Sequence, residues 1–252
     1  LARCRRHGGA LQHAGGQGRA VSAGHVSHGV QACHGGAAPL RVAVFGSFYR
    51  GFHVLSELLK GPLAARIEVV GVATDDPQAS FVSRERRVWA YPHSAEEETM
   101  VARLAAAHGL PAYRGRVKSE EFYRLYEREW RPQLCIAATF GQQFDARLHR
   151  FPCHGFYNLH PCVDDGWPSA YAGPNPFQAL LDDGADHAVI ALHEVDDGFD
   201  TGRLLALSEK IYFPPTASVV DLHKSTSPLA AKLLAQHVAR LIEAPQAQHA
   251  AA

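Results

Sequence analysis

The chain has 252 residues, of which 46% are hydrophobic and 20% charged. This is ordinary globular composition, enough for one large domain or two small ones. No apolar run reaches the about 18 residues that a membrane-spanning helix needs, so a membrane partner is not expected. Four of the 25 Lys and Arg residues lie in residues 1–39, which hold no acid, so the other 21 face 25 Asp and Glu, a net charge of −4. A mildly acidic body binds polyanions poorly, and this excludes a nucleic acid as the expected partner.

The two ends of the chain differ from its body. Residues 1–38 consist mostly of Gly, Ala and His and cannot bury enough apolar surface to offset the loss of conformational entropy, so we predict disorder there and in the tail 245–252. Residues 39–244 are the predicted catalytic domain. The N-terminal segment lacks the apolar stretch of a signal peptide. The three Cys of the body have no framework spacing, which favours reduced thiols and a cytoplasmic location.

The body alternates predicted strands and helices. In chain order we expect a strand at 40–46, a helix at 52–60, a strand at 66–75, helices at 94–109 and 119–130, strands at 133–140 and 155–160, a short helix at 176–184, strands at 188–195 and 203–213, and a long helix at 218–243. Ser94 and Ser119 are the expected N-caps, and a break is expected before Pro228. The pattern predicts a doubly wound, mostly parallel α/β sheet, with an antiparallel strand pair near the end and a C-terminal helix. Ligands bind such sheets at the carboxyl ends of the strands.

The Gly-rich turn "FGSFYRG" after the first strand suggests a nucleotide site at first sight. Gly46 and Gly51 have the separation of a P-loop, but Phe52 and His53 stand where Lys and Ser or Thr are required. A dinucleotide-binding pattern fails as well, because position 48 is Phe. We therefore interpret the segment as a sharp turn above the sheet.

The densest group of reactive side chains is "CHGFYNLHPC" at 153–162. A zinc site would use Cys153, His154, His160 and Cys162, which could converge only through a tight reversal of the chain. A Cys162 nucleophile lacks a nearby feature that would lower its pKa. A buried histidine at a strand end, without chemistry, is the third interpretation.

The motifs downstream point to a fourth interpretation. Asn158-x-His160-Pro161 is followed by Gly-Pro-x-Pro at 173–176, by a strand that contains His193, and by Asp200-Thr-Gly. Together they resemble the formyltransferases that use 10-formyltetrahydrofolate, over about residues 40 to 210. The segment "HPCVDDGWPSAY" replaces the usual Ser-Leu-Leu-Pro and is most similar to the N5-hydroxyornithine formyltransferases of siderophore biosynthesis. The resemblance implies a formyltransferase that acts on a small hydroxylated amine.

The resemblance also implies roles for individual residues. The catalytic residues would be Asn158, His160 and Asp200, with Asn158 and a protonated His160 donating to the oxyanion and Asp200 raising the pKa of His160. His193 would support them without direct catalysis. No metal is expected. The residues implied for donor binding are Phe140, Gly141, Gln142, Gln143, Phe144, Val195, Asp196 and Asp197.

Four residues are candidates for binding the acceptor. Asp164, Asp165 and Trp167 form a loop beside the catalytic His, in which carboxylates suit an α-ammonium group. Arg50, after the first strand, could meet a carboxylate. A nucleotide-linked amino sugar is an alternative acceptor, whereas an initiator tRNA is disfavoured by the acidic body. A zinc-binding module or hydrolase is the alternative from another class, and the sequence leaves the oligomeric state open.

Overall fold

The computed structural model describes residues 38–85, 87–164 and 166–244. The disorder predicted for 1–38 and 245–252 therefore concerns residues outside the described ranges, Ala38 excepted, as does every prediction for Asp165.

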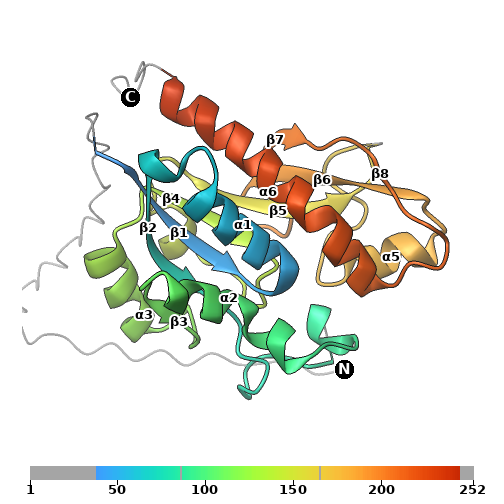
Figure 1. Cartoon of the computed structure of the whole chain (residues 1–252), viewed down its shortest axis with the longest axis horizontal. Coiled ribbons are helices and arrows are strands. Elements are labelled where there is room, and N and C mark those ends of the chain that lie inside the picture. The colour runs from blue at the N-terminus through green and yellow to red at the C-terminus, as the bar shows by residue number, and fades with distance from the viewer. Residues whose placement is uncertain (1–37, 86, 165, 245–252) are drawn as a thin grey trace, which may run out of the picture.

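An eight-stranded sheet forms the centre of the molecule (Figure 1). Its strands are β1 (Leu40–Gly46), β2 (Ile67–Ala73), β3 (Ala112–Tyr113), β4 (Leu134–Ala138), β5 (Phe156–Cys162), β6 (His187–Glu194), β7 (Leu204–Leu207) and β8 (Ile211–Tyr212). The order is β3-β2-β1-β4-β5-β6-β7, with β8 also paired to β6. All pairs up to β4–β5 are parallel, whereas β6 is antiparallel to β5, β7 and β8. The predicted mostly parallel sheet with an antiparallel end is confirmed.

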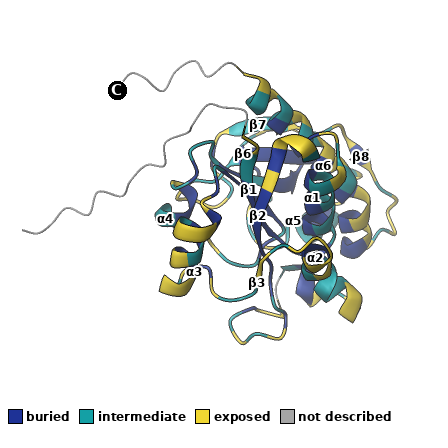
Figure 2. Ribbon diagram, turned by 60° about the vertical axis from the view of Figure 1, so that its left-hand side comes forward, coloured by how far each residue is buried: buried dark blue, intermediate teal, exposed yellow. Residues whose placement is uncertain are grey.

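Helices cover both faces of this sheet (Figures 1 and 2). They are α1 (Phe48–Lys60), α2 (Ala95–Ala107), α3 (Glu120–Arg124), which continues as a π-helical segment (Leu125–Trp130), α4 (Ala146–His149), α5 (Pro176–Asp182) and α6 (Val219–Glu243). Helices α1, α2, α5 and α6 lie on one face, over a core that includes Val44, Leu55 and Leu234. Helices α3 and α4 cover the other, over a core built on Phe45 and Tyr126. Because Val44 and Phe45 are neighbours in β1, strand alternation explains the two cores.

Both expected N-caps form, but α1 begins at Phe48, before the predicted start at residue 52. Ser94 forms a capping box with Glu97 at the start of α2, and Ser119 accepts from the backbone of α3. Helix α6, in contrast, runs unbroken through Pro228, so the predicted break is wrong. Leu222 and Leu234, buried on either side of Pro228, pack the helix onto the sheet, and this packing outweighs the missing hydrogen bond.

The turn after β1 is as tight as its glycines suggested. A Cβ on Gly46 would lie 2.8 Å from the Cα of Gly51, and a Cβ on Gly51 would lie 2.6 Å from the carbonyl carbon of Gly46. Glycine at both positions lets α1 begin immediately above the strand end. Arg50 is thereby directed into the interior, where 2% of it is exposed.

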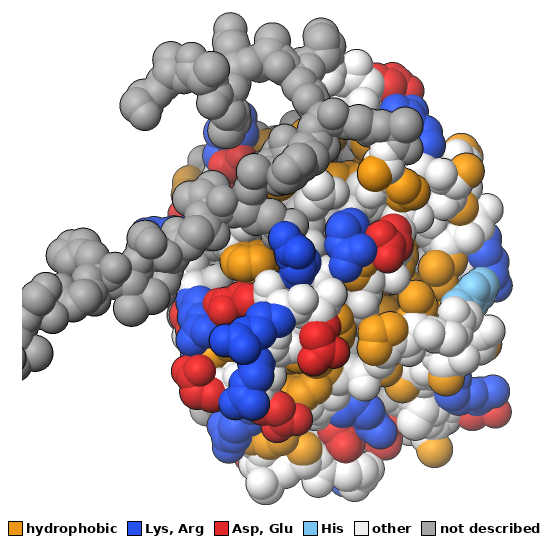
Figure 3. All heavy atoms as spheres, turned by 90° about the vertical axis from the view of Figure 1, so that its left-hand side faces the viewer, with side chains coloured by type: hydrophobic (Ala, Val, Ile, Leu, Met, Phe, Trp, Pro, Cys, Tyr) orange, Lys and Arg blue, Asp and Glu red, His pale blue; other side chains and the backbone are white. Residues whose placement is uncertain are grey.

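The surface carries paired charges over α3. Figure 3 shows Lys and Arg side chains beside Asp and Glu on the face at the left of Figure 1. Arg147 contacts both Glu120 and Glu127, and Arg41 contacts Glu68. In the described part of the chain, no helix combines the length and the apolar character that crossing a bilayer requires.

Candidate active site

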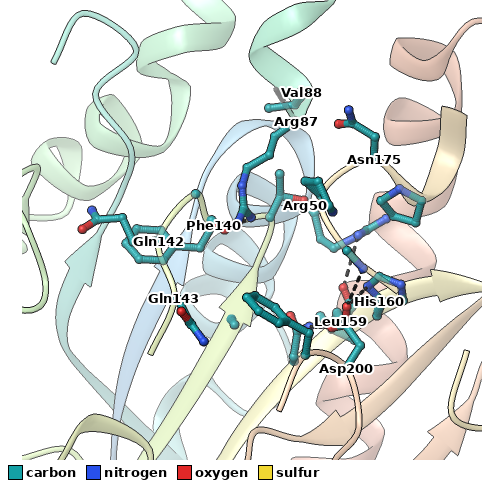
Figure 4. A pocket seen from close by; sticks show the side chains of 18 of the residues that line it. Arg50, Arg87, Val88, Phe140, Gln142, Gln143, Leu159, His160, Asn175 and Asp200 are labelled. Carbon is teal, nitrogen blue, oxygen red and sulfur yellow. Dashed lines mark hydrogen bonds and ion pairs between the residues drawn. The ribbon is translucent and has the colours of Figure 1, made fainter. Parts of the chain in front are cut away.

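A pocket of about 440 Å³ lies beside the carboxyl end of β4 (Figure 4). Three of its lining residues lie abreast in neighbouring strands, since Ala137 of β4 pairs with Asn158 of β5, and Asn158 pairs with His193 of β6. The pairing of β6 with β7 shifts register between Leu192 and His193. Such irregularities re-aim side chains next to active sites. The hydrogen-bonded sheet therefore sets the position of two candidate polar groups.

Asn158 is tied to two neighbours. Its amide nitrogen lies 3.1 Å from Oδ1 of Asp200 and 3.2 Å from Nε2 of His193. Nδ1 of His193 lies 2.7 Å from the carbonyl oxygen of Glu194, which can only accept, so Nδ1 carries the proton and Nε2 accepts. Both N–H groups of Asn158 are therefore engaged, and His193 contacts Asn158, as a supporting role for His193 requires.

His160 is buried between two acceptors. Its Nε2 lies 2.9 Å from the carbonyl oxygen of Tyr171, and its Nδ1 lies 3.4 Å from Oδ2 of Asp200. Burial lowers the pKa of His160 below its ordinary value, against the opposing effects of Asp200 and the Tyr171 carbonyl. Asp200 raises this pKa, as expected, but desolvation of the imidazolium is the larger effect, so the net shift opposes the expected protonated ring.

Asp200 joins these groups from the loop after β6. Besides Asn158, it accepts a hydrogen bond of 3.1 Å from the backbone N–H of Gly173, and its φ of 51° lies in the left-handed region that Asp tolerates. Burial raises its pKa, but the adjacent His193 and the charge of His160 outweigh that effect and lower the pKa to about 2. Asp200 is therefore a carboxylate throughout the physiological range.

The residues predicted for donor binding form one side of the pocket, with a single exception. Phe140, Gly141, Gln142, Gln143, Phe144, Val195 and Asp196 all line it. The rings of Phe140 and Phe144 stack at 5.6 Å, and Phe144 packs on Phe156 at 4.4 Å. The Gln142 amide is bound to backbone groups of Gly115 and Val117, so this side chain fastens the loop. The wall offers flat apolar rings.

Asp197 is the exception. It does not line the pocket, and its carboxylate contacts His149 at 3.0 Å and Arg150 at 2.5 Å. Its pKa is lowered by the hydrogen bond to His149 and by the charge of Arg150. Its assignment to the donor site is therefore wrong, because contacts with His149 and Arg150 hold it outside the pocket.

Asp164 and Trp167 of the predicted acceptor loop also lie outside the pocket. Asp164 contacts His187 and Lys210, each at 3.0 Å, and these partners lower its pKa to about 2. Trp167 donates to the carbonyl oxygen of Gly202 at 2.8 Å and packs on the ring of His193 at 4.7 Å. Neither lines the pocket, so both assignments to acceptor binding are corrected: Asp164 is drawn to the β6–β8 end, and Trp167 supports His193 from behind.

Arg50 does line the pocket, and it has neighbours that the sequence did not single out. His223 of α6, Asn175 before α5, and Asp75 and Arg87 from the segments after β2 line the pocket too. The polar ending of the "RIEVVGVATD" strand was the available signal for Asp75. The other three stand in segments whose sequence pattern indicates only a helix, a turn or a surface loop.

Metal binding finds no geometric support in the described ranges. Within them, no three His, Cys, Asp or Glu side chains converge as a metal site requires. His160 faces Tyr171 and Asp200, whereas Cys162 packs with Val189 and Ala191. Two of the four candidate ligands of the zinc interpretation, His160 and Cys162, thus contact different neighbours.

Known proteins similar to this chain share this architecture. The model of a family described as formyl transferase matches residues 40–238. The methionyl-tRNA formyltransferases of Syntrophomonas wolfei subsp. wolfei and Thermus thermophilus are 27% and 32% identical over 192 and 170 residues, covering 76% and 67% of this chain and 56% and 49% of theirs. The chain thus spans about half the length of these curated relatives.

Solved structures support the fold. A phosphoribosylglycinamide formyltransferase from Anaplasma phagocytophilum gives a TM-score of 0.60 at 17% identity, over 81% of this chain and 88% of that one. A formyltetrahydrofolate deformylase from Pseudomonas syringae pv. tomato gives 0.59 at 16% identity, over 82% and 62%. At such identities the likeness concerns the fold alone.

Proposed function

The chain belongs to the formyl transferase family, and on that premise we propose that it transfers a formyl group from 10-formyltetrahydrofolate to the side-chain nitrogen of N5-hydroxyornithine, as in siderophore biosynthesis. One observation carries the proposed chemistry. Asp200, 42 residues after Asn158 in sequence, contacts both Asn158 and His160 at a pocket with an aromatic wall.

His160 is the proposed base. Its lowered pKa leaves the ring neutral near neutral pH, so it can take the proton that the attacking nitrogen loses. Nε2 carries the hydrogen, because it faces the Tyr171 carbonyl, and the free lone pair is on Nδ1 beside Asp200. Once Nδ1 is protonated, the Asp200 carboxylate stabilises the imidazolium.

Asn158 is the proposed donor to the formyl oxygen, where negative charge develops during attack. Both of its N–H groups have partners, so one must be released. The bond to the Asp200 carboxylate is charge-assisted and stronger than the bond to neutral His193. We therefore expect the N–H that faces His193 to turn toward the substrate while Asp200 keeps Asn158 in place.

The pocket suits the donor in shape and polarity. The folate supplies an activated formyl group, and its flat pterin ring requires apolar walls with few polar contacts. Phe140 and Phe144 provide stacked rings on this side, with Val195 adjoining them. A Cβ at Gly141 would approach the carboxylate of Asp75 to 2.7 Å, so glycine there keeps the loop close to the end of β2.

A hydroxylated acceptor nitrogen fits a site with a weak base. An alkyl amine has a pKa of about 10.4, so less than about 0.1% is a free nucleophile at neutral pH. A hydroxyl group on the nitrogen withdraws electron density and lowers its basicity by several units. The acceptor is then neutral before it binds, and His160 need only remove the proton released after attack.

Two other acceptors stay in competition. A nucleotide-linked amino sugar is the second candidate among small molecules, because the same chemistry serves it. Methionyl-tRNA is a third candidate acceptor, because the relatives described above are methionyl-tRNA formyltransferases.

The experiment offers 10-formyltetrahydrofolate with ornithine, N5-hydroxyornithine, a nucleotide-linked amino sugar or methionyl-tRNA, and follows release of tetrahydrofolate. N5-hydroxyornithine should exceed the others by orders of magnitude. Faster turnover of the sugar or the tRNA would reject the hydroxyornithine acceptor but keep formyl transfer. The absence of turnover with every acceptor, together with binding of zinc at one ion per chain, would favour the metal alternative.

A further inference from the structure

Arg50 is a buried cation with no anion beside it. Its side chain is 2% exposed, and among the described residues no carboxylate forms an ion pair with it. Nη1 donates to the carbonyl oxygen of Leu159 at 3.2 Å and Nη2 to Oγ1 of Thr226 at 3.3 Å, while Nε is buried without a partner. Burial lowers the pKa of Arg50 only to about 10, so the charge persists. An uncompensated buried charge is costly and calls for an explanation.

His223 lies on the same side of the pocket and has the same feature. It is 8% exposed, and its Nδ1 is buried without a partner. Phe177 connects the two residues, since its ring lies 4.9 Å from the ring of His223 and 5.4 Å from the guanidinium of Arg50. Burial and the charge of Arg50 hold the pKa of His223 well below its ordinary value. The imidazole is therefore neutral and has one donor or acceptor position to offer.

Asn175 adds an acceptor. Its Oδ1 is buried without a partner, and the residue lines the pocket two positions before Phe177. In Figure 4 Asn175 lies above Arg50, and Arg50 adjoins His160. Arg50 and Asn175 lie opposite Phe140 and Gln142 in Figure 4, and His223 is joined to Arg50 through the Phe177 ring. Each of the three residues thus brings an unpartnered polar atom to this part of the molecule.

We propose that Arg50, His223 and Asn175 form a subsite for the α-amino-acid head of the acceptor. The carboxylate is recognised by Arg50 with His223, and the α-ammonium group by Oδ1 of Asn175. All three atoms are covered in this conformation, so the head group makes contact after Asn175, the half-buried member, turns aside. The inference rests on the proposed formyl transfer and specifies its acceptor.

A phosphate group fits this end of the pocket less well than an amino acid. One guanidinium beside a neutral imidazole compensates a monoanion, whereas a phosphate dianion would keep about one charge in excess. Asp75 and Asp200 line the same pocket and would repel that excess, and Arg87, the other arginine of the lining, donates to the carbonyl oxygen of Phe140 at the opposite end. A carbonyl oxygen such as Oδ1 of Asn175 also repels phosphate oxygens but accepts from an ammonium group.

A binding experiment separates the two halves of the head group without needing turnover. Calorimetric titration of the full chain compares L-ornithine with putrescine, which lacks the carboxylate, and with 5-aminopentanoate, which lacks the α-ammonium group. Each omission should weaken binding by about 10- to 100-fold, the range for charged hydrogen bonds. Inorganic phosphate, titrated in parallel, should bind more weakly than ornithine.

Two variants assign the contacts. Arg50→Met should weaken ornithine binding to the level of putrescine and leave putrescine unaffected. Asn175→Ala should weaken ornithine to the level of 5-aminopentanoate and leave 5-aminopentanoate unaffected. Arg103→Met, an exposed residue of α2, is the matched control and should change neither. If Arg50→Met fails to fold, the wild-type series and Asn175→Ala decide.

The outcomes distinguish this inference from the function on which it rests. Equal binding of the three amines, or preferred binding of phosphate, overturns the amino-acid subsite. Equal formylation of N5-hydroxyornithine and N-hydroxyputrescine also overturns it, although formyl transfer then stands. Ornithine binding that depends on Arg50 and Asn175, without any formylation, keeps the subsite and rejects the proposed function.

Discussion

The two ends of the pocket differ in how completely their polar groups are satisfied. At the end formed by residues 140–144, aromatic rings pack on one another and the Gln142 amide is bound at both of its atoms. At the other end, Arg50, His223 and Asn175 each hold a buried polar atom without a partner. Figure 4 shows Phe140 and Gln142 on one side and Arg50 and Asn175 on the other. Polar groups that already have hydrogen-bond partners hold the first end in place before a ligand binds. Buried polar atoms without partners are stabilised when a ligand supplies the missing hydrogen bonds. Under the proposed function, we therefore assign specificity for the acceptor to the second end.

The largest effect is expected where the two ends meet. Asp200→Asn removes the charge that holds Asn158 and stabilises protonated His160, and should lower the rate of formyl transfer by at least about a hundredfold. Folate binding should largely persist in a fluorescence titration. Asp197→Asn is the matched control, since that carboxylate contacts His149 and Arg150 outside the pocket. Comparable losses in the two variants would mean that the wrong carboxylate has been assigned.

A smaller effect, confined to the formyl donor, is expected when a ring is removed from the aromatic wall of Phe140 and Phe144. Phe144→Ala removes a ring that stacks on Phe140 and should raise the KM for 10-formyltetrahydrofolate by about tenfold, in line with the energy of an aromatic contact. The KM for the acceptor should stay unchanged. Steady-state kinetics with each substrate varied in turn test this, and an equal rise in both KM values would contradict the separation of the two ends.

The buried histidines of the pocket, His223 and His160, should make the stability of the folded protein sensitive to acid. Burial lowers the pKa of His223 and of His160, so the unfolded chain binds protons more tightly at these positions than the folded chain does. The contribution of these two histidines to the free energy of unfolding is therefore fully present above the ordinary pKa of 6.5 and is lost as pH falls through the lowered pKa values. His223→Gln should reduce the fall in melting temperature between about pH 7 and pH 5. An unchanged fall in melting temperature would show that other groups determine the acid sensitivity. His53 and His237, whose pKa values burial also lowers, would be the next to test.

The smallest effect is expected for the acidic loop. Asp164→Asn breaks contacts to His187 and Lys210 at the exposed β6–β8 end, and exposed ion pairs contribute little. The KM for the acceptor should change by less than about twofold. A rise in this KM comparable to the loss of affinity expected for Arg50→Met would show that Asp164 contacts the acceptor.

The sequence predicts the parts of the site that depend on regular structure. Strand periodicity places Asn158 and His160 in one strand and His193 in another, and the resemblance adds Asp200. Periodicity does not reveal that β6 is antiparallel to β5, the arrangement that sets His193 beside Asn158. That requires the partner of each strand, which only the folded chain determines.

The errors arise from competition between neighbours. Asp164 and Asp197 follow strands, as ligand-binding residues do, yet Lys210 and the pair His149 and Arg150 hold them elsewhere. A charge on a loop can reach several partners, and local sequence does not rank them. Likewise the pKa of His160 depends on burial, which exceeds the attraction of the adjacent Asp200. The place of Arg50 after the first strand is visible in the sequence, but its partners in the subsite come from α6 and from the turn before α5, both distant in sequence.

The row of Ala137, Asn158 and His193 has a consequence for how this family could diversify. These residues are fixed by paired strands, and a slip of one residue would turn each side chain to the opposite face of the sheet. Arg50 and His223 instead belong to helices and Asn175 to the turn before α5, so each can be substituted without changing any strand register. New acceptors could therefore evolve by exchange of residues outside the strands, while the reactive groups are inherited intact.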